Sequence, residues 1–187
     1  MLFRSIQWKR WRRAGSPVSA EPFRGFESWA DELWNRARTL HSLCMARDAA
    51  VLNCLYPPDD RCRFVRVRYG SSIGGWAAIL VSEMRGNPYF GNMRLGTILD
   101  GLALPECIAP TVRAAAAALE DMGVDLVVSN QSDARWISAL RDAGFIPGPS
   151  NYALSLSPSL VERIPDFARQ QAHIHVTRGD GDGRVRL

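Results

Sequence analysis

The stretch RLGTILDGLALPECIAPTVRAAAAALEDMGVDLVVSN, residues 94–130, decides the fold. Residues 94–104 are typical of an apolar strand, the alanine-rich middle favours a helix over 110–122, and residues 124–129 form a short apolar run typical of a buried strand. A strand, a helix and a second strand joined by short right-handed connections place the two strands in parallel. The stretch therefore predicts that residues 97–104 and 124–130 are parallel neighbours in one sheet.

Two further strands are predicted upstream of this unit. Residues 63–69, RFVRVRY, alternate apolar side chains with arginine at period two, which is typical of a half-exposed strand. Residues 76–84 are almost wholly apolar, and turns separate them from the strands on either side. Three consecutive strands with short connections predict an antiparallel meander.

Helices are predicted before the meander. Over residues 26–45 apolar side chains recur every three or four positions, and Ser28 with Asp31 resembles a capping box. His41 lies on the apolar face of this helix, where a lone histidine is more often a hydrogen-bonded core residue than a base or ligand. A second short helix is expected over residues 49–55.

The remaining pattern completes an α+β (mixed α/β) domain over residues 26–165. Ser132 or Asp133 is placed to cap a helix that runs to Ala143, and residues 151–157 are expected to form a final core strand. The order of elements predicts a mixed, mostly antiparallel sheet flanked by helices.

Two segments are predicted to lie outside this domain. Residues 1–25 form a basic, aromatic arm. Its first fourteen residues alone carry five positive charges and no acid, so subtracting them from the net charge of +4 leaves −1 for the rest of the chain. A nucleic-acid partner is therefore not expected, because phosphate recognition usually needs a basic face on the folded body. The arm could contact an anionic membrane or be the end of a preceding module, and the second interpretation is preferred. Residues 166–187 are expected to add a short strand and a solvated Gly/Asp tail.

Composition excludes several further classes. A chain of 187 residues that is 47% hydrophobic and 22% charged suits a folded domain. Its four cysteines lack CxxC spacing and fit reduced core thiols, so no metal site is expected. The sequence contains no apolar run of roughly 20 residues and no signal peptide, so a cytoplasmic location is expected.

Several motifs carry a resemblance to a known family. The order of strands and helices, together with VVSN at residues 127–130 and Gly144-Phe145 behind it, resembles the GNAT superfamily of acyl-CoA-dependent N-acetyltransferases. More narrowly, the residues from Arg47 to Tyr56, the stretch SNQSDARWISALRDAGF and the terminal TRGDGDG are similar to the second half of two-module GNAT-type proteins of bacterial polysaccharide machinery. This resemblance implies an upstream GNAT-like module or a second copy as partner, and a small-molecule or sugar amine as substrate.

The resemblance also implies where acetyl-CoA would bind as co-substrate. In such enzymes two parallel strands splay apart and expose backbone groups to the pantetheine arm, while amides at the next helix hold the pyrophosphate. Here Leu102 and Leu104 would offer backbone groups on the first strand. Asn130, at the end of the second strand, could bind pantetheine or serve as a turn residue of the chain itself.

Two departures from the family pattern bear on activity. Residues 104–110, LPECIAP, contain no glycine, no cation and two prolines, so a pyrophosphate would meet few donors there. The place where the family often has a tyrosine acid holds Leu140. Tyr152 could replace that acid and Asp100 could act as a base toward an amine, although each is also a simple core or strand-end residue.

Two functions therefore remain open. The first is acyl transfer from acetyl-CoA to an amine, with this chain as the second module of a larger enzyme. The second is a noncatalytic GNAT-like module that packs on an active partner module and shapes its substrate site. Fold resemblance alone does not choose between them.

Overall fold

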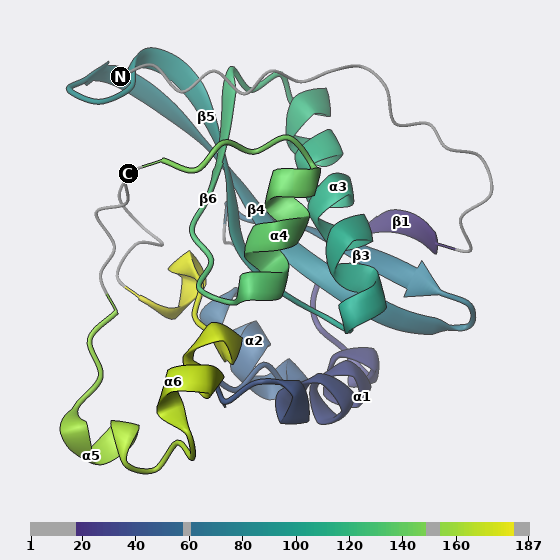
Figure 1. The fold of residues 1–187 in the computed structure, drawn as a ribbon. Helices are drawn as coiled ribbons and strands as arrows, with labels where there is room; N and C mark the ends of the chain where they lie inside the picture. The colour runs from purple at the N-terminus through teal and green to yellow at the C-terminus, as the bar shows by residue number, and fades with distance from the viewer. Residues whose placement is uncertain (1–17, 58–60, 149–153, 182–187) are drawn as a thin grey trace.

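The computed structural model describes residues 18–57, 61–148 and 154–181, which form a sheet with helices on both faces (Figure 1). The five strands of the main sheet are, in spatial order, β1 (Val18–Phe23), β3 (Arg63–Tyr69), β4 (Ser72–Asn87), β5 (Gly91–Ala103) and β6 (Leu126–Ser129). A separate two-stranded parallel sheet joins β2 (Leu43–Cys44) to β7 (Ile174–His175).

The helical elements vary widely in length. The α-helices are α1 (Ser28–Ala37), α2 (Ala49–Leu55), α3 (Pro105–Asp121), α4 (Ala134–Asp142), α5 (Pro158–Val161) and α6 (Phe167–Gln170). The 3₁₀ turns are η1 (Arg38–Leu40), η2 (Gln171–His173) and η3 (Arg178–Asp180). None of the helices within the described ranges has the length and apolar character needed to cross a membrane.

The predicted sheet is confirmed. Strands β3, β4 and β5 form the antiparallel meander, and β5 pairs in parallel with β6 from Leu95 opposite Leu126 to Ile98 opposite Ser129. Helix α3 makes the crossover between these two parallel strands, as the sequence of this unit predicts.

The core has two apolar layers, one on each face of the sheet. Along β4, Trp76 and Ala78 pack with the residues of α1 and α2, whereas Ala77 and Ile79 pack with those of α3 and α4. Successive side chains of a strand point to opposite faces, so a strand covered on both faces reads as a continuous apolar run. This explains why the sequence of β4 shows no alternation.

The expectation that residues 1–25 stay outside the core is wrong for the part that the structure describes. Val18–Phe23 forms edge strand β1 and pairs with β3 along its whole length. The Phe23 ring lies 5.0 Å from that of Trp29 and 5.4 Å from that of Phe64, centroid to centroid. Pro22 interrupts the pattern in the sequence, but an edge strand tolerates proline. Residues 1–17 lie outside the described residues.

The first helix is shorter than expected. Helix α1 ends at Ala37, and the chain reaches His41 in an extended conformation before β2. The predicted capping box is also wrong, because the N-cap is Glu27 without a side-chain bond, and the Asp31 carboxylate accepts a 2.8 Å hydrogen bond from the Ala49 amide. Helix α2 has the predicted bounds.

Proline and aspartate residues in the sequence mark where helices α3 and α4 begin. Helix α3 begins at Pro105, five residues before the expected start, because a proline in the first turn loses only an amide that has no helical partner. Asp133 is the N-cap of α4 and accepts a 2.8 Å bond from the Arg135 amide, which decides between the two predicted caps. Gly144 follows that helix with φ of 88°.

Two expectations for the C-terminal part are corrected. Residues 154–157 are not a core strand but an irregular and mostly exposed segment, while residues 151–153 lie outside the described residues. The tail after β7 is not solvated over its first turn, since Thr177 and Arg178 are each 5% exposed and Gly179 is buried. Those positions are buried because they pack against the sheet.

Candidate functional site

The strands β5 and β6 separate at one end of the sheet. Their parallel pairing stops at Ile98 and Ser129, but β5 continues to Ala103. Residues 174–180, which we call the C-terminal insert, lie between the two diverging segments. In Figure 1 this yellow part of the chain turns back toward the end of β6.

Hydrogen bonds join the C-terminal insert to both sides. On the β5 side, His175 Nε2 lies 2.8 Å from the Gly101 carbonyl oxygen. On the side of β6, Thr177 forms an antiparallel bridge with Gln131, which follows that strand. The C-terminal insert therefore bridges the place where β5 and β6 no longer pair.

A buried ion-pair network holds the C-terminal insert against β5. The Arg47 guanidinium donates to Asp100 Oδ1 at 2.9 Å and to Asp180 Oδ2 at 2.6 Å. Asp100 also accepts from the hydroxyls of Thr177 and Tyr56, each at 2.9 Å. The Asp100 carboxylate of β5 therefore joins three parts of the chain: Arg47 before helix α2, Tyr56 after that helix, and Thr177 of the C-terminal insert.

The charges in this network stabilise each other. Burial alone would raise the pKa of Asp100, but the Arg47 charge and the hydrogen bonds from Arg47 and Tyr56 together hold that pKa below its usual range. Burial likewise works against the Arg47 cation, yet Asp100 and Asp180 raise its pKa above the ordinary value. The Tyr56 pKa is raised by burial and by the Asp100 charge, so the phenol stays protonated and donates its hydrogen bond.

The predicted site residues occupy different positions around this network. Asp100 lies at its centre and is 1% exposed. Leu102 pairs with β4, and the Leu104 amide donates to the Gly74 carbonyl oxygen at 2.8 Å, so these backbone positions face β4 and not β6.

The structure says less about the other two predicted residues, Asn130 and Tyr152. Asn130 is half-buried directly after β6. Tyr152 lies outside the described residues, so the structure does not bring it together with Asp100.

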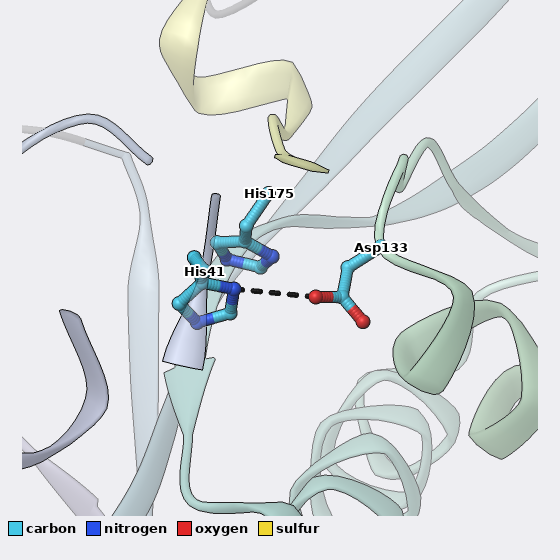
Figure 2. A group of neighbouring side chains, drawn as sticks. All are labelled: His41, Asp133 and His175. Atoms are coloured by element: carbon cyan, nitrogen blue, oxygen red, sulfur yellow. Dashed lines mark hydrogen bonds and ion pairs between the residues drawn. The ribbon is translucent and has the colours of Figure 1, made fainter. Parts of the chain in front are cut away.

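A second cluster adjoins the C-terminal insert and joins His41, Asp133 and His175 (Figure 2). His41 Nδ1 lies 3.2 Å from Asp133 Oδ2, and the two imidazole centroids are 4.7 Å apart. Arg135 pairs with both carboxylate oxygens of Asp133. The hydrogen-bond contacts with His41 and Arg135, together with the Arg135 charge, outweigh the effect of burial and keep the Asp133 pKa below its usual range. The expectation that His41 is a buried, hydrogen-bonded residue agrees with this contact, although His41 lies beyond the helix.

We predict that His175 makes stability depend on pH. Burial, assisted by the Arg47 charge, lowers the His175 pKa to about 3, so between that value and about 6.5 the unfolded state binds a proton that the folded state does not. The free energy of unfolding should therefore fall as pH drops below 6.5, by up to about 1.4 kcal/mol per unit from this group. Denaturant titrations at pH 7, 6 and 5 in metal-free buffer measure it. His175→Gln should flatten the profile, and an unchanged slope in that variant would contradict the assignment.

Sequence reasoning missed most members of the buried network. Arg47, Tyr56, Thr177 and Asp180 were not recognised as site residues, although all four lie in motifs that carry the narrower resemblance. Arg47 and Tyr56 are more than 100 residues away from Thr177 and Asp180 in the chain. The opposite charges of Arg47 and Asp180 are the signal that could have linked the two motifs.

Comparison with solved structures identifies the fold. An aminoglycoside acetyltransferase, meta-AAC0020, from an uncultured soil metagenomic sample matches with a TM-score of 0.51 at 12% identity, over 75% of this chain and 97% of that one. Wild-type TTHA1254 from Thermus thermophilus matches with a TM-score of 0.47 at 17% identity, over 74% and 96%. A GNAT family acetyltransferase from Staphylococcus aureus matches at 0.46 and 13%, over 74% and 98%.

Sequence comparison finds no protein-family model and no curated protein that matches the chain. At 12–17% sequence identity, the structural likeness shows that the fold is shared and nothing more. The chain shares with the aminoglycoside acetyltransferase a mixed, mostly antiparallel sheet flanked by helices, as the sequence predicted for the fold class.

Proposed function

We propose that this chain is a noncatalytic GNAT-like module that acts by packing on a partner module. One observation carries the proposal: residues 174–180 lie between the ends of β5 and β6. In the acyltransferases that the chain resembles, the pantetheine arm of acetyl-CoA uses the corresponding strand opening. Here His175 already engages the Gly101 carbonyl in that opening.

The helix that would hold a pyrophosphate supports the same proposal. Helix α3 begins at Pro105, two residues after the last residue of β5, so there is no loop of free amides between them. Pro105 lacks an N–H, and Glu106 adds a negative charge in the first turn. Anions bind helix N-termini through amide donors and a favourable dipole, and both are weakened here.

The position of Asp100 also supports a structural role. A general base must reach the proton that it removes, directly or through one water. Asp100 is 1% exposed, and Arg47, Tyr56, Thr177 and the Gly101 amide already donate to its oxygens. A substrate amine would have to displace these partners.

The second candidate function is N-acyl transfer from acetyl-CoA to a small-molecule or sugar amine. The fold likeness to an aminoglycoside acetyltransferase favours it. In that case Asp100 would be the base, Tyr152 the acid, and Leu102, Leu104 and Asn130 would line the acetyl-CoA site. The C-terminal insert would first have to leave β5.

The partner that we propose is an upstream GNAT-like module, or a second copy of this chain. The motifs around Arg47 and in TRGDGDG support this, since they resemble the second half of two-module proteins linked to bacterial polysaccharide synthesis. Such a module would contribute by shaping the substrate site of its active neighbour.

We predict that the chain alone binds acetyl-CoA with a dissociation constant weaker than about 1 mM. Each charge-assisted hydrogen bond missing at the pyrophosphate is worth about 1.5–3 kcal/mol, so two such losses weaken binding at least about a hundredfold. Isothermal titration of the full chain with acetyl-CoA measures this, with cooperative thermal unfolding as the control for a folded sample. A low-micromolar constant would overturn the noncatalytic proposal and favour the second candidate.

A further inference from the structure

Of the cluster of His41, Asp133 and His175, only the Nε2 atom of His175 enters the proposed function, through its contact with the Gly101 carbonyl oxygen. The members of the cluster come from three distant parts of the chain: the segment before β2, the N-cap of α4, and β7. Each offers a nitrogen or oxygen atom, and the three atoms all lie within 4.8 Å of one another. We propose that this cluster binds one divalent transition-metal ion, for which Zn²⁺ is the best fit.

The hydrogen bond of His175 leaves one nitrogen ready to bind a metal. Nε2 lies 2.8 Å from the Gly101 carbonyl oxygen, and because a carbonyl only accepts, Nε2 must carry the hydrogen. In the neutral ring, Nδ1 then has a bare lone pair. This atom is fully buried and has no hydrogen-bond partner. Metal-binding histidines typically donate their other ring N–H to a carbonyl or carboxylate in this way.

The spacing of the other two residues suits joint coordination. His41 Nδ1 and Asp133 Oδ2 are 3.2 Å apart. Two ligands at about 2.0–2.1 Å from one tetrahedral ion are separated by roughly 3.3 Å, so little movement is needed. The side chains of His41 and Asp133 are 1% and 0% exposed, and Figure 2 shows both histidine rings beside the carboxylate.

The set of donor atoms points to the class of ion. Two imidazole nitrogens and one carboxylate oxygen suit Zn²⁺ and related first-row ions, whereas Mg²⁺ and Ca²⁺ prefer oxygen ligands alone. The carboxylate offsets part of the charge of the ion. Three protein ligands leave one tetrahedral position for a water molecule.

Arg135 competes with the ion for the same ligands. Its guanidinium bonds Asp133 Oδ2 and lies 3.1 Å from His41 Nδ1, so it now supplies the positive charge at this place. The Arg135 side chain is 26% exposed and can turn toward solvent. The metal ion and the Arg135 guanidinium should therefore not occupy the cluster at the same time. A cluster that only stabilises the fold would show no such competition.

An ion at this site would fix the C-terminal insert. His175 belongs to that insert, while His41 and Asp133 belong to the segments on either side. Since an ion that binds the folded state stabilises it, Zn²⁺ should raise the melting temperature of the chain.

The test is a titration of the chelator-treated full chain with Zn²⁺ by calorimetry, and with Co²⁺ by visible absorption. We expect one ion per chain and, with Co²⁺, the intense bands of a four-coordinate site. Arg135→Ala should bind at least tenfold more tightly than the parent. His41→Gln and His175→Gln should each weaken binding at least tenfold. His173→Ala, which removes the third histidine of the chain, should stay within twofold.

Each other outcome overturns the proposal. One is the absence of binding in both the parent and Arg135→Ala. Another is binding that survives both glutamine variants, because the ion then sits elsewhere. Cooperative thermal unfolding of each metal-free variant shows that the variant is folded. Asp133→Asn is tested in parallel, so that a ligand variant remains if one of the histidine variants does not fold.

Discussion

Replacing Asp100 with alanine will lower the free energy of unfolding by about 3–5 kcal/mol. The substitution leaves the Arg47 guanidinium, 1% exposed, with one carboxylate in place of two in a buried setting. The hydroxyls of Tyr56 and Thr177 each lose a 2.9 Å hydrogen bond to Asp100 as well. Guanidinium chloride titration at pH 7 measures the change, and the melting temperature should fall by roughly 6–20 °C.

The matched control for Asp100→Ala is an exposed ion pair on the same sheet. Glu83 and Arg94 approach to 2.9 Å, but their side chains are 59% and 45% exposed. Surface pairs of this kind contribute about 0–1 kcal/mol, so Glu83→Ala should change stability little. If Asp100→Ala costs no more than this control, the network does not hold the C-terminal insert as we describe.

The second large effect is expected for Gly179→Ala. A Cβ built on Gly179 would lie 2.6 Å from the Tyr56 hydroxyl oxygen and 3.0 Å from Asp100 Cβ. Overpacking of this kind costs typically about 1–3 kcal/mol, because the neighbours must shift. We expect a loss in that range in chemical denaturation at pH 7, together with a lower melting temperature.

Gly181→Ala provides the comparison for Gly179→Ala. Gly181 lies two residues further along the chain, and a Cβ there would meet nothing within 4 Å. Its substitution should leave stability within about 0.5 kcal/mol of the parent. Equal effects of the two substitutions would show that the C-terminal insert is loosely held, which would favour the acyltransferase alternative.

The predictable part of the fold rests on local patterns. Alternation in RFVRVRY, the apolar run of β4 and the strand-helix-strand unit of residues 94–130 each predict an element whose neighbours lie close in sequence. The cap by Asp133 is likewise a contact between residues two apart. Such features depend on interactions that are encoded within a few residues, so they can be inferred without the tertiary structure.

Other boundaries depend on distant partners. Residues 18–23 form a strand only because β3 offers an unpaired edge more than 40 residues later. Helix α1 ends at Ala37, although the apolar period continues, because the chain must extend to pair β2 with β7. A helical period alone contains no information about that pairing.

The sequence by itself determined the class of fold, a mixed and mostly antiparallel sheet flanked by helices, because strand and helix periods follow from the side chains along each segment. Only the tertiary structure decided where residues 177–181, the described part of the TRGDGDG motif, go. A short polar segment is buried only when another part of the chain meets its polar groups, and here Arg47 pairs with Asp180 while Asp100 accepts from the Thr177 hydroxyl. That pairing across 133 residues brings Asp180 beside Arg47 and places His175 next to His41. Periodicity cannot specify such a contact, because it depends on the three-dimensional arrangement of all the elements between.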